Sequence, residues 1–218
     1  MLRDVLQQSG LIAILRGLRP AEAIDVAEAL YQEGLRVLEV PLNTPLALLS
    51  IQAIRKALPP DCLVGAGTVT TPAQVAAVRE AGGEIIVMPH GDRRVLDAAI
   101  ITGLDVLPGV ATPTEAFAAL AAGATLLKLF PADHLGPAVL RAWLAVLPPE
   151  AACVPVGGIH PENLREFLRA GAIGVGIGSA LYQAGMTSEA AGLRARRFVE
   201  AWNVAKRLRR TAASETSR

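Results

Sequence analysis

A short unit recurs along this chain of 218 residues: a helix end marked by glycine, an apolar run, a turn and a new helix. Glycine is favoured in the left-handed conformation that ends many helices, so each of these glycines predicts a passage from helix to strand. Other passages carry paired prolines, which stop a helix because proline has no N–H to donate. The glycine-marked copies cover residues 32–41, 80–89, 102–108, 122–131 and 170–177, and the proline-marked ones cover 58–61 and 147–150.

Helix starts follow a pattern of their own. A capping residue stands before a proline, which is tolerated at the first position of a helix because its missing N–H would have no partner there. Weaker caps precede proline at Arg19-Pro20 and Gly136-Pro137. The better caps are Thr44-Pro45, Thr71-Pro72, Thr112-Pro113 and His160-Pro161.

Apolar runs predict eight strands, each followed by a helix. Short apolar strands that alternate with helices indicate parallel pairing, because parallel strands need crossover connections and are buried on both faces. Eight such units close into a (β/α)8 TIM barrel. A doubly wound sheet is the structural alternative, but no glycine-rich dinucleotide loop follows the first strand. The runs centre on Ile14, Leu38, Val64, Ile86, Val106, Leu127, Val154 and Val175.

The barrel is expected to form a single domain over residues 1–205, opened by a helix over residues 2–8. A hydrophobic fraction of 52% permits a large core, and α/β barrels of this size occur as one domain. From Lys206 onward, arginines and a Ser/Thr-rich end predict a flexible C-terminal tail over residues 206–218.

Composition excludes several classes of protein. A net charge of +1 argues against broad nucleic-acid binding. Glycine, proline and charged residues interrupt every apolar run before it could span a bilayer, and the first residues lack the pattern of a signal peptide. Isolated Cys62 and Cys153 give neither a disulfide framework nor metal-ligand spacing. With histidines scattered at 90, 134 and 160, we expect no metal and no cofactor, no membrane association and a cytoplasmic location.

Lys128 lies inside the apolar run of residues 124–131, whereas the other lysines, Lys56 and Lys206, lie in polar helical stretches. Burial disfavours the ammonium form and lowers its pKa, which leaves a free amine that can attack a carbonyl. The alternative is a lysine near a strand end whose charged head reaches water. Lys128 alone does not decide between these readings.

Polar residues gather at the expected carboxyl ends of the strands, where barrels of this type carry out their chemistry. Arg16 follows the first strand, Glu39 lies in the second and Thr68 follows the third, while Lys128 belongs to the sixth. Arg16 could lower the pKa of Lys128 and Glu39 could raise it, so the net direction stays open. Each residue has a structural alternative: an Arg16–Glu39 ion pair, a surface arginine or a threonine in a turn.

Glycine-rich loops follow the seventh and eighth strands, at Gly157-Gly158 and at 176–179, where Ser179 follows Gly178. In such barrels these loops bind phosphate on backbone N–H groups and a helix N-terminus. Any one glycine could instead serve a tight turn. The pair of loops predicts a phosphate site.

Taken together, these motifs resemble the class I aldolases of the KDPG/KHG family. The resemblance runs in order over roughly residues 10–205. It is strongest with the branch that acts on 2-dehydro-3-deoxy-6-phosphogalactonate, since the gluconate branch usually has Thr-Leu-Arg-Thr where this chain has Pro41-Leu42-Asn43-Thr44. The motifs are residues 39–45, 65–69, 108–115, 127–132, 155–159 and 176–181.

The resemblance implies a role for each candidate residue. Lys128 would form a Schiff base and Glu39 would act as acid and base. Arg16 and Thr68 would bind the carboxylate of the pyruvyl group, while Gly158, Gly178 and Ser179 would bind the phosphate of a 2-keto-3-deoxy sugar acid. Members of the family are typically homotrimers.

Other functions remain open at this point. The gluconate epimer or 4-hydroxy-2-oxoglutarate could be the substrate. A metal-free isomerase or decarboxylase of a sugar phosphate would keep both glycine loops without needing an iminium. A non-catalytic binding barrel is the third reading, although a binder gains little from a desolvated lysine.

Overall fold

A computed structural model describes residues 1–216 of the chain. Strands and helices alternate along it, and within the described residues no helix is both long and apolar enough to cross a membrane. The strands are β1 Leu11–Ile14, β2 Val37–Pro41, β3 Leu63–Gly67, β4 Ile85–Val87, β5 Asp105–Leu107, β6 Gly109–Val110, β7 Leu126–Leu129, β8 Ala152–Pro155 and β9 Val175–Ile177. The helices are α1 Leu2–Ser9, α2 Pro20–Gln32, α3 Ala47–Ala57, α4 Pro72–Glu80, α5 Arg93–Ile101, α6 Pro113–Ala121, α7 Ala132–Leu144, α8 Leu164–Ala170 and α9 Ser188–Thr216.

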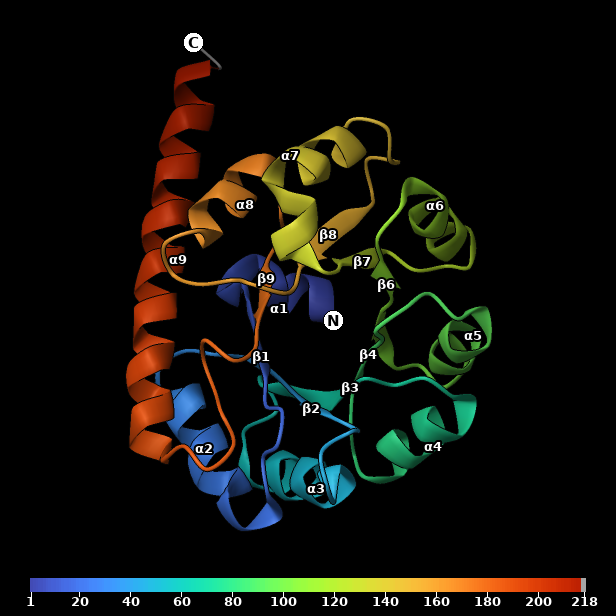
Figure 1. Ribbon diagram of the computed structural model, residues 1–218, viewed down its shortest axis with the longest axis vertical. Helices are drawn as coiled ribbons and strands as arrows, with labels where there is room; N and C mark the ends of the chain where they lie inside the picture. The colour runs from blue at the N-terminus through green and yellow to red at the C-terminus, as the bar shows by residue number, and fades with distance from the viewer. Residues whose placement is uncertain (217–218) are drawn as a thin grey trace.

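All strand pairs are parallel, as expected, and they form two sheets. One has the order β5-β4-β3-β2-β1-β9 and the other has the order β6-β7-β8. The strands curve around a common interior with the helices outside (Figure 1). Each of the eight expected strands is present, but the fifth is divided into β5 and β6 because Pro108, which has no N–H to donate, stands between them.

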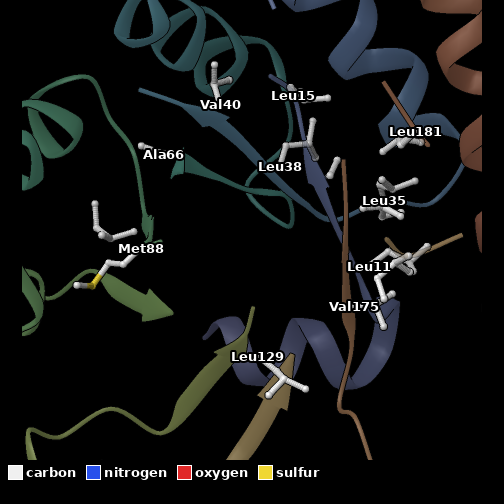
Figure 2. Packing of buried hydrophobic residues seen from close by; sticks show 14 of the residues in the cluster. Leu11, Leu15, Leu35, Leu38, Val40, Ala66, Met88, Leu129, Val175 and Leu181 are labelled. Atoms are coloured by element: carbon white, nitrogen blue, oxygen red, sulfur yellow. The ribbon is translucent and has the colours of Figure 1, made fainter. Parts of the chain in front are cut away.

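Side chains alternate between the two faces of each strand, which divides the apolar residues into two clusters. One cluster fills the space between strands and helices; Figure 2 shows Leu38, Val40 and Leu129 from it. The other occupies the interior that the strands surround and contains Val37 and Leu126. Glu39 and Lys128 each lie two residues after one of these on the same strand, so both side chains point inward.

Helix α1 closes the interior at the amino ends of the strands. Leu2 and Leu6 are fully buried and belong to the interior cluster. Arg3 donates hydrogen bonds of 2.6 Å to the carbonyl oxygens of Thr125 and Glu150, just before β7 and β8. The expectation of a leading helix is confirmed, and this helix leaves only the carboxyl ends of the strands open.

The predicted helix starts are correct for α4 and α6, where Thr71 and Thr112 accept hydrogen bonds from the N–H groups of Gln74 and Glu115. The starts at Pro45 and Pro161 are wrong. Helix α3 begins at Ala47, because the Thr44 hydroxyl accepts from the N–H of Gly17 instead of capping the helix. Helix α8 begins at Leu164, after a turn over residues 161–163.

Helix α9 crosses the domain boundary that was expected after residue 205. Lys206 donates to the carbonyl oxygens of Gln7 and Gln8 at the end of α1, and Arg209 donates to that of Ala172. The expected boundary therefore lies inside α9, and side chains beyond residue 205 contact α1 and Ala172. Flexibility of the later tail stays a prediction, and residues 217–218 lie outside the described part.

Replacement of Leu6 by alanine tests the role of α1. The change removes a fully buried side chain from the interior cluster, so we expect a loss of about 2–5 kcal/mol in the free energy of unfolding. Urea denaturation followed by circular dichroism measures it. Gln8→Ala, at an exposed position of the same helix, is the control and should stay within about 0.5 kcal/mol of the parent. Equal effects of the two changes would contradict this account of α1.

Candidate active site

Lys128 projects from β7 into the interior and is 7% exposed. Its Nζ lies 4.6 Å from the centre of the Phe130 ring, two residues further along the chain. Desolvation is the largest influence on the amine and lowers its pKa; the charge of Arg16 acts in the same direction, and Glu39 opposes both. The net direction, which the sequence left open, is therefore downward and favours the neutral amine.

Glu39 lies on β2 and is 2% exposed. Burial raises the pKa of its carboxyl group to about 7, although Lys128, Arg16 and a hydrogen bond from the Gly67 backbone act in the opposite direction. Within the described residues its Oε2 atom has no hydrogen-bond partner. A carboxyl group with a pKa near 7 and one free oxygen can both accept and donate a proton.

Gly67 makes room for this carboxyl group. A side chain at Gly67 would overlap the carboxyl atoms of Glu39. Thr68, the next residue, is partly exposed and has a φ of 55°. That left-handed conformation is unusual for a β-branched residue, and such outliers cluster at functional sites.

Arg16 leaves β1 toward solvent and forms no ion pair with Glu39 within the described residues. Its Nη1 donates a hydrogen bond of 2.8 Å to Oδ1 of Asn43 in the loop after β2. The N–H of Gly17 donates to the Thr44 hydroxyl at 2.9 Å. The structural alternative of an Arg16–Glu39 pair therefore fails, and two hydrogen bonds join the loops that follow β1 and β2.

A cavity of about 520 Å³ opens beside these residues. Arg16, Phe130 and both glycine loops line it, including Gly158, Gly178 and Ser179. Since Phe130 also contacts Lys128, the cavity adjoins the buried amine. The structure thus places the candidates from six separate segments at the carboxyl ends of the strands. Lys128, Glu39 and Thr68 are not among the residues that line the cavity.

The two glycine loops differ in how much space a side chain would have at their glycines. Gly158 has a φ of 65°, and a Cβ there would come within 2.5 Å of the Asp133 side chain. A Cβ at Gly178 would meet nothing within 4 Å. The expected helix N-terminus is not found at either loop: the Gly178 carbonyl accepts hydrogen bonds from Leu181 and Tyr182, which closes a single turn.

Several residues near the cavity were not predicted. Phe130 could have been found, since it lies two positions after Lys128, directly beyond the end of β7. Asn43 was noted only as part of a motif. Asn163, the residue before α8, and Arg194 of α9 bond to the glycine loops, and the sequence analysis singled out neither.

A metal or cofactor would need ligands that converge. Within residues 1–216, no group of three His, Cys, Asp or Glu residues lies close enough together to hold a metal ion. The chemistry available to the described site is that of an amine of lowered pKa, a carboxyl group of raised pKa, an arginine and backbone N–H groups.

Known proteins share this architecture. The chain is 45% identical over 195 residues to the 2-dehydro-3-deoxy-6-phosphogalactonate aldolase of Escherichia coli strain K12, which covers 89% of this chain and 95% of that protein. A solved structure described as native KDPGal is 44% identical with a TM-score of 0.90, covering 92% and 97% of the two chains. The KDPG aldolase of Legionella pneumophila, solved with pyruvate captured at low pH as a covalent carbinolamine, is 31% identical with a TM-score of 0.79, covering 92% and 96%.

A family model described as KDPG and KHG aldolase matches residues 2–193, which is most of the described chain. This match agrees with the order of the motifs and with the buried amine beside a carboxyl group. The chain therefore belongs to the KDPG and KHG aldolase family.

Proposed function

We propose that this protein is a class I aldolase that cleaves 2-dehydro-3-deoxy-6-phospho-D-galactonate to pyruvate and D-glyceraldehyde 3-phosphate. The observation that carries the proposal is the burial of Lys128, whose side chain is 7% exposed. Its amine has a lowered pKa and interacts by charge with the carboxyl group of Glu39. The carbinolamine captured in the Legionella enzyme and the name of the Escherichia coli relative support it.

The reaction begins at the neutral amine of Lys128, which attacks the C2 ketone; loss of water gives an iminium. The Glu39 carboxylate then accepts the proton of the C4 hydroxyl. The C3–C4 bond breaks, its electron pair moves into the iminium to form an enamine, and the aldehyde leaves. Protonation of the enamine at C3 by the Glu39 carboxylic acid and hydrolysis of the imine release pyruvate and restore Lys128.

Binding of the two substrate ends is assigned to separate groups. Arg16 and Thr68 would bind the pyruvyl carboxylate, since a guanidinium can donate two parallel hydrogen bonds to it. Gly158, Gly178 and Ser179 would bind the phosphate through backbone N–H groups and one hydroxyl. Arg16 and both glycine loops line one cavity, which supports their binding the two ends of one substrate.

The proposal extends to a closed barrel, a homotrimeric assembly and a cytoplasmic location. The two sheets would form one closed (β/α)8 barrel, supported by an isolated parallel bridge between Val156 and Gly176 and by the short Pro108 link between β5 and β6. A homotrimer is inferred from the family resemblance. Buried, unpaired Cys62 and Cys153 suit the reducing cytoplasm.

The main competing substrate is the C4 epimer, 2-dehydro-3-deoxy-6-phospho-D-gluconate. The loop of residues 41–44, which differs from the usual gluconate pattern, favours the galactonate substrate. Turnover of the two purified epimers, compared by kcat/KM, decides between them. A higher kcat/KM for the gluconate epimer would overturn the substrate assignment while leaving the Schiff-base chemistry intact.

Borohydride reduction tests the covalent step. Added with pyruvate, it should inactivate the enzyme and leave a reduced pyruvyl group on Lys128, located by peptide mass spectrometry. Lys128→Arg should lose turnover, because a guanidinium keeps its charge and supplies no free amine. An adduct confined to Lys56 or Lys206, or no adduct, would refute the class I assignment.

Glu39→Gln tests proton transfer separately from binding. We expect kcat to fall about 10²- to 10⁴-fold, because general acid–base catalysis contributes roughly that much, while pyruvate trapping on Lys128 persists. In the parent enzyme the carboxylate base is lost as the pH falls through about 7, where the Glu39 pKa lies, so kcat should fall there too. The pH–rate profile of the variant should lack this acidic limb. Near-normal kcat in the variant would mean that another group is the base.

Gly178→Val tests the phosphate site. The new side chain enters open space at the cavity, so it should raise KM for the phosphorylated substrate much more than for its unphosphorylated analogue. Gly158 is less suitable, since its positive φ and the nearby Asp133 would strain the fold. Gly192→Ala in α9, whose new methyl group makes only an ordinary contact with Ala29, is the matched control. Equal losses on both substrates would show that Gly178 serves the turn alone.

A further inference from the structure

The loop after β8 is braced by a side chain that does not line the cavity. Nδ2 of Asn163 donates a hydrogen bond of 2.8 Å to the carbonyl oxygen of Gly158. Oδ1 of the same amide accepts one of 3.0 Å from the N–H of His160. Asn163 therefore binds both a carbonyl and an N–H of the loop, which sets the orientation of its peptide groups.

The loop after β9 is braced in the same way from α9. Nη1 of Arg194 donates to the carbonyl oxygen of Ser179 at 3.3 Å, and Nε2 of Gln183 donates to the same oxygen at 3.3 Å. Arg194 does not line the cavity, whereas Ser179 and Ala180 do. The Ser179 carbonyl thus has one donor on α9 and one in Gln183, a residue that lines the cavity.

These contacts orient the N–H groups as well. In a trans peptide the carbonyl and the following N–H point in opposite directions. With the carbonyls of Gly158 and Ser179 held toward Asn163 and Arg194, the N–H groups of Ile159 and Ala180 point the other way, and both residues line the cavity. Within the described residues neither N–H donates a backbone hydrogen bond, so both donors are available to a ligand.

Arg194 differs from two neighbouring arginines on α9, which are paired with carboxylates. Arg196 is paired with Glu33 at 2.7 Å, and Arg197 is paired with Glu162 at 3.4 Å. Within the described residues Arg194 forms no ion pair and donates to a backbone carbonyl instead. Its charge therefore stays uncompensated beside a loop that lines the cavity, where it attracts an anion. A donor on the Ser179 carbonyl also polarises the peptide and strengthens the Ala180 N–H as a donor.

We propose that Asn163 and Arg194 are positioning residues for the phosphate end of the substrate. They donate to the Gly158 and Ser179 carbonyls and so orient the N–H groups of Ile159 and Ala180 for a phosphate dianion, and Arg194 adds the positive charge that the loops themselves lack. The inference rests on the proposed function and assigns work to residues outside the glycine motifs.

Inorganic phosphate, as a competitive inhibitor, and the matched pair of phosphorylated and unphosphorylated substrates provide the test. Arg194→Leu and Asn163→Ala should each raise KM for the phosphorylated substrate, and Ki for inorganic phosphate, about three- to tenfold, the size expected for one hydrogen bond. KM for the unphosphorylated substrate, and the rate of pyruvate trapping on Lys128, should change less than twofold. A purely structural role would move all of these values together.

Two further variants sharpen the result. Arg194→Gln keeps a side-chain donor without the charge, so it should recover part of the loss seen with leucine. Arg196→Gln makes the same change of charge two residues further along α9 and should leave the ratio of the two KM values at its parent value. Three results would each overturn the proposal. They are an Arg194→Gln variant no better than Arg194→Leu, a change in the KM ratio in Arg196→Gln as large as that in Arg194→Leu, and a KM ratio that Arg194→Leu leaves unchanged. Failure of the parent enzyme to trap pyruvate would instead refute the proposed function.

Discussion

The site depends on placing an amine and a carboxyl group together in an interior that is otherwise apolar. Desolvation moves the pKa of Lys128 down and that of Glu39 up, so each group is driven toward its neutral form. Their mutual attraction opposes both shifts without reversing either. The shift of Glu39 favours proton transfer near neutral pH, and the shift of Lys128 favours the nucleophilic form of its amine.

Alternation along the strands is what makes this arrangement possible. Glu39 and Lys128 share the parity of Val37 and Leu126, so the inward direction of both follows from the pattern that builds the interior cluster. Helix α1 fills the amino end of this interior with Leu2 and Leu6. The polar pair is consequently reached from the carboxyl end, beside the cavity that the glycine loops line. Packing at one end of the strands and chemistry at the other are separate tasks.

Much of the fold could be predicted because its signals are local. Gly34 and Gly171, for example, end helices in the left-handed region, as their place before apolar runs indicated. The observed starts of α3 and α8 differ from the predicted starts at Pro45 and Pro161. The Thr44 hydroxyl bonds to the distant Gly17 N–H, and the Asn163 amide bonds within its own loop to His160 and Gly158. The candidate site could be predicted from the strand ends. The contacts of Asn43 and Arg194 could not be predicted, since they depend on which loops and helices the fold brings together.

Helix α9 has a consequence for engineering. From Arg194 beside a glycine loop to Arg209 beside Ala172 it covers about 22 Å at 1.5 Å per residue, and it continues to Thr216. A second helical protein joined in frame to this helix would inherit its axis. Each residue inserted at the junction would rotate the fused protein by about 100° around the helix axis and move it about 1.5 Å along that axis. The number of residues inserted after the last helix would therefore set the direction that a fused protein faces.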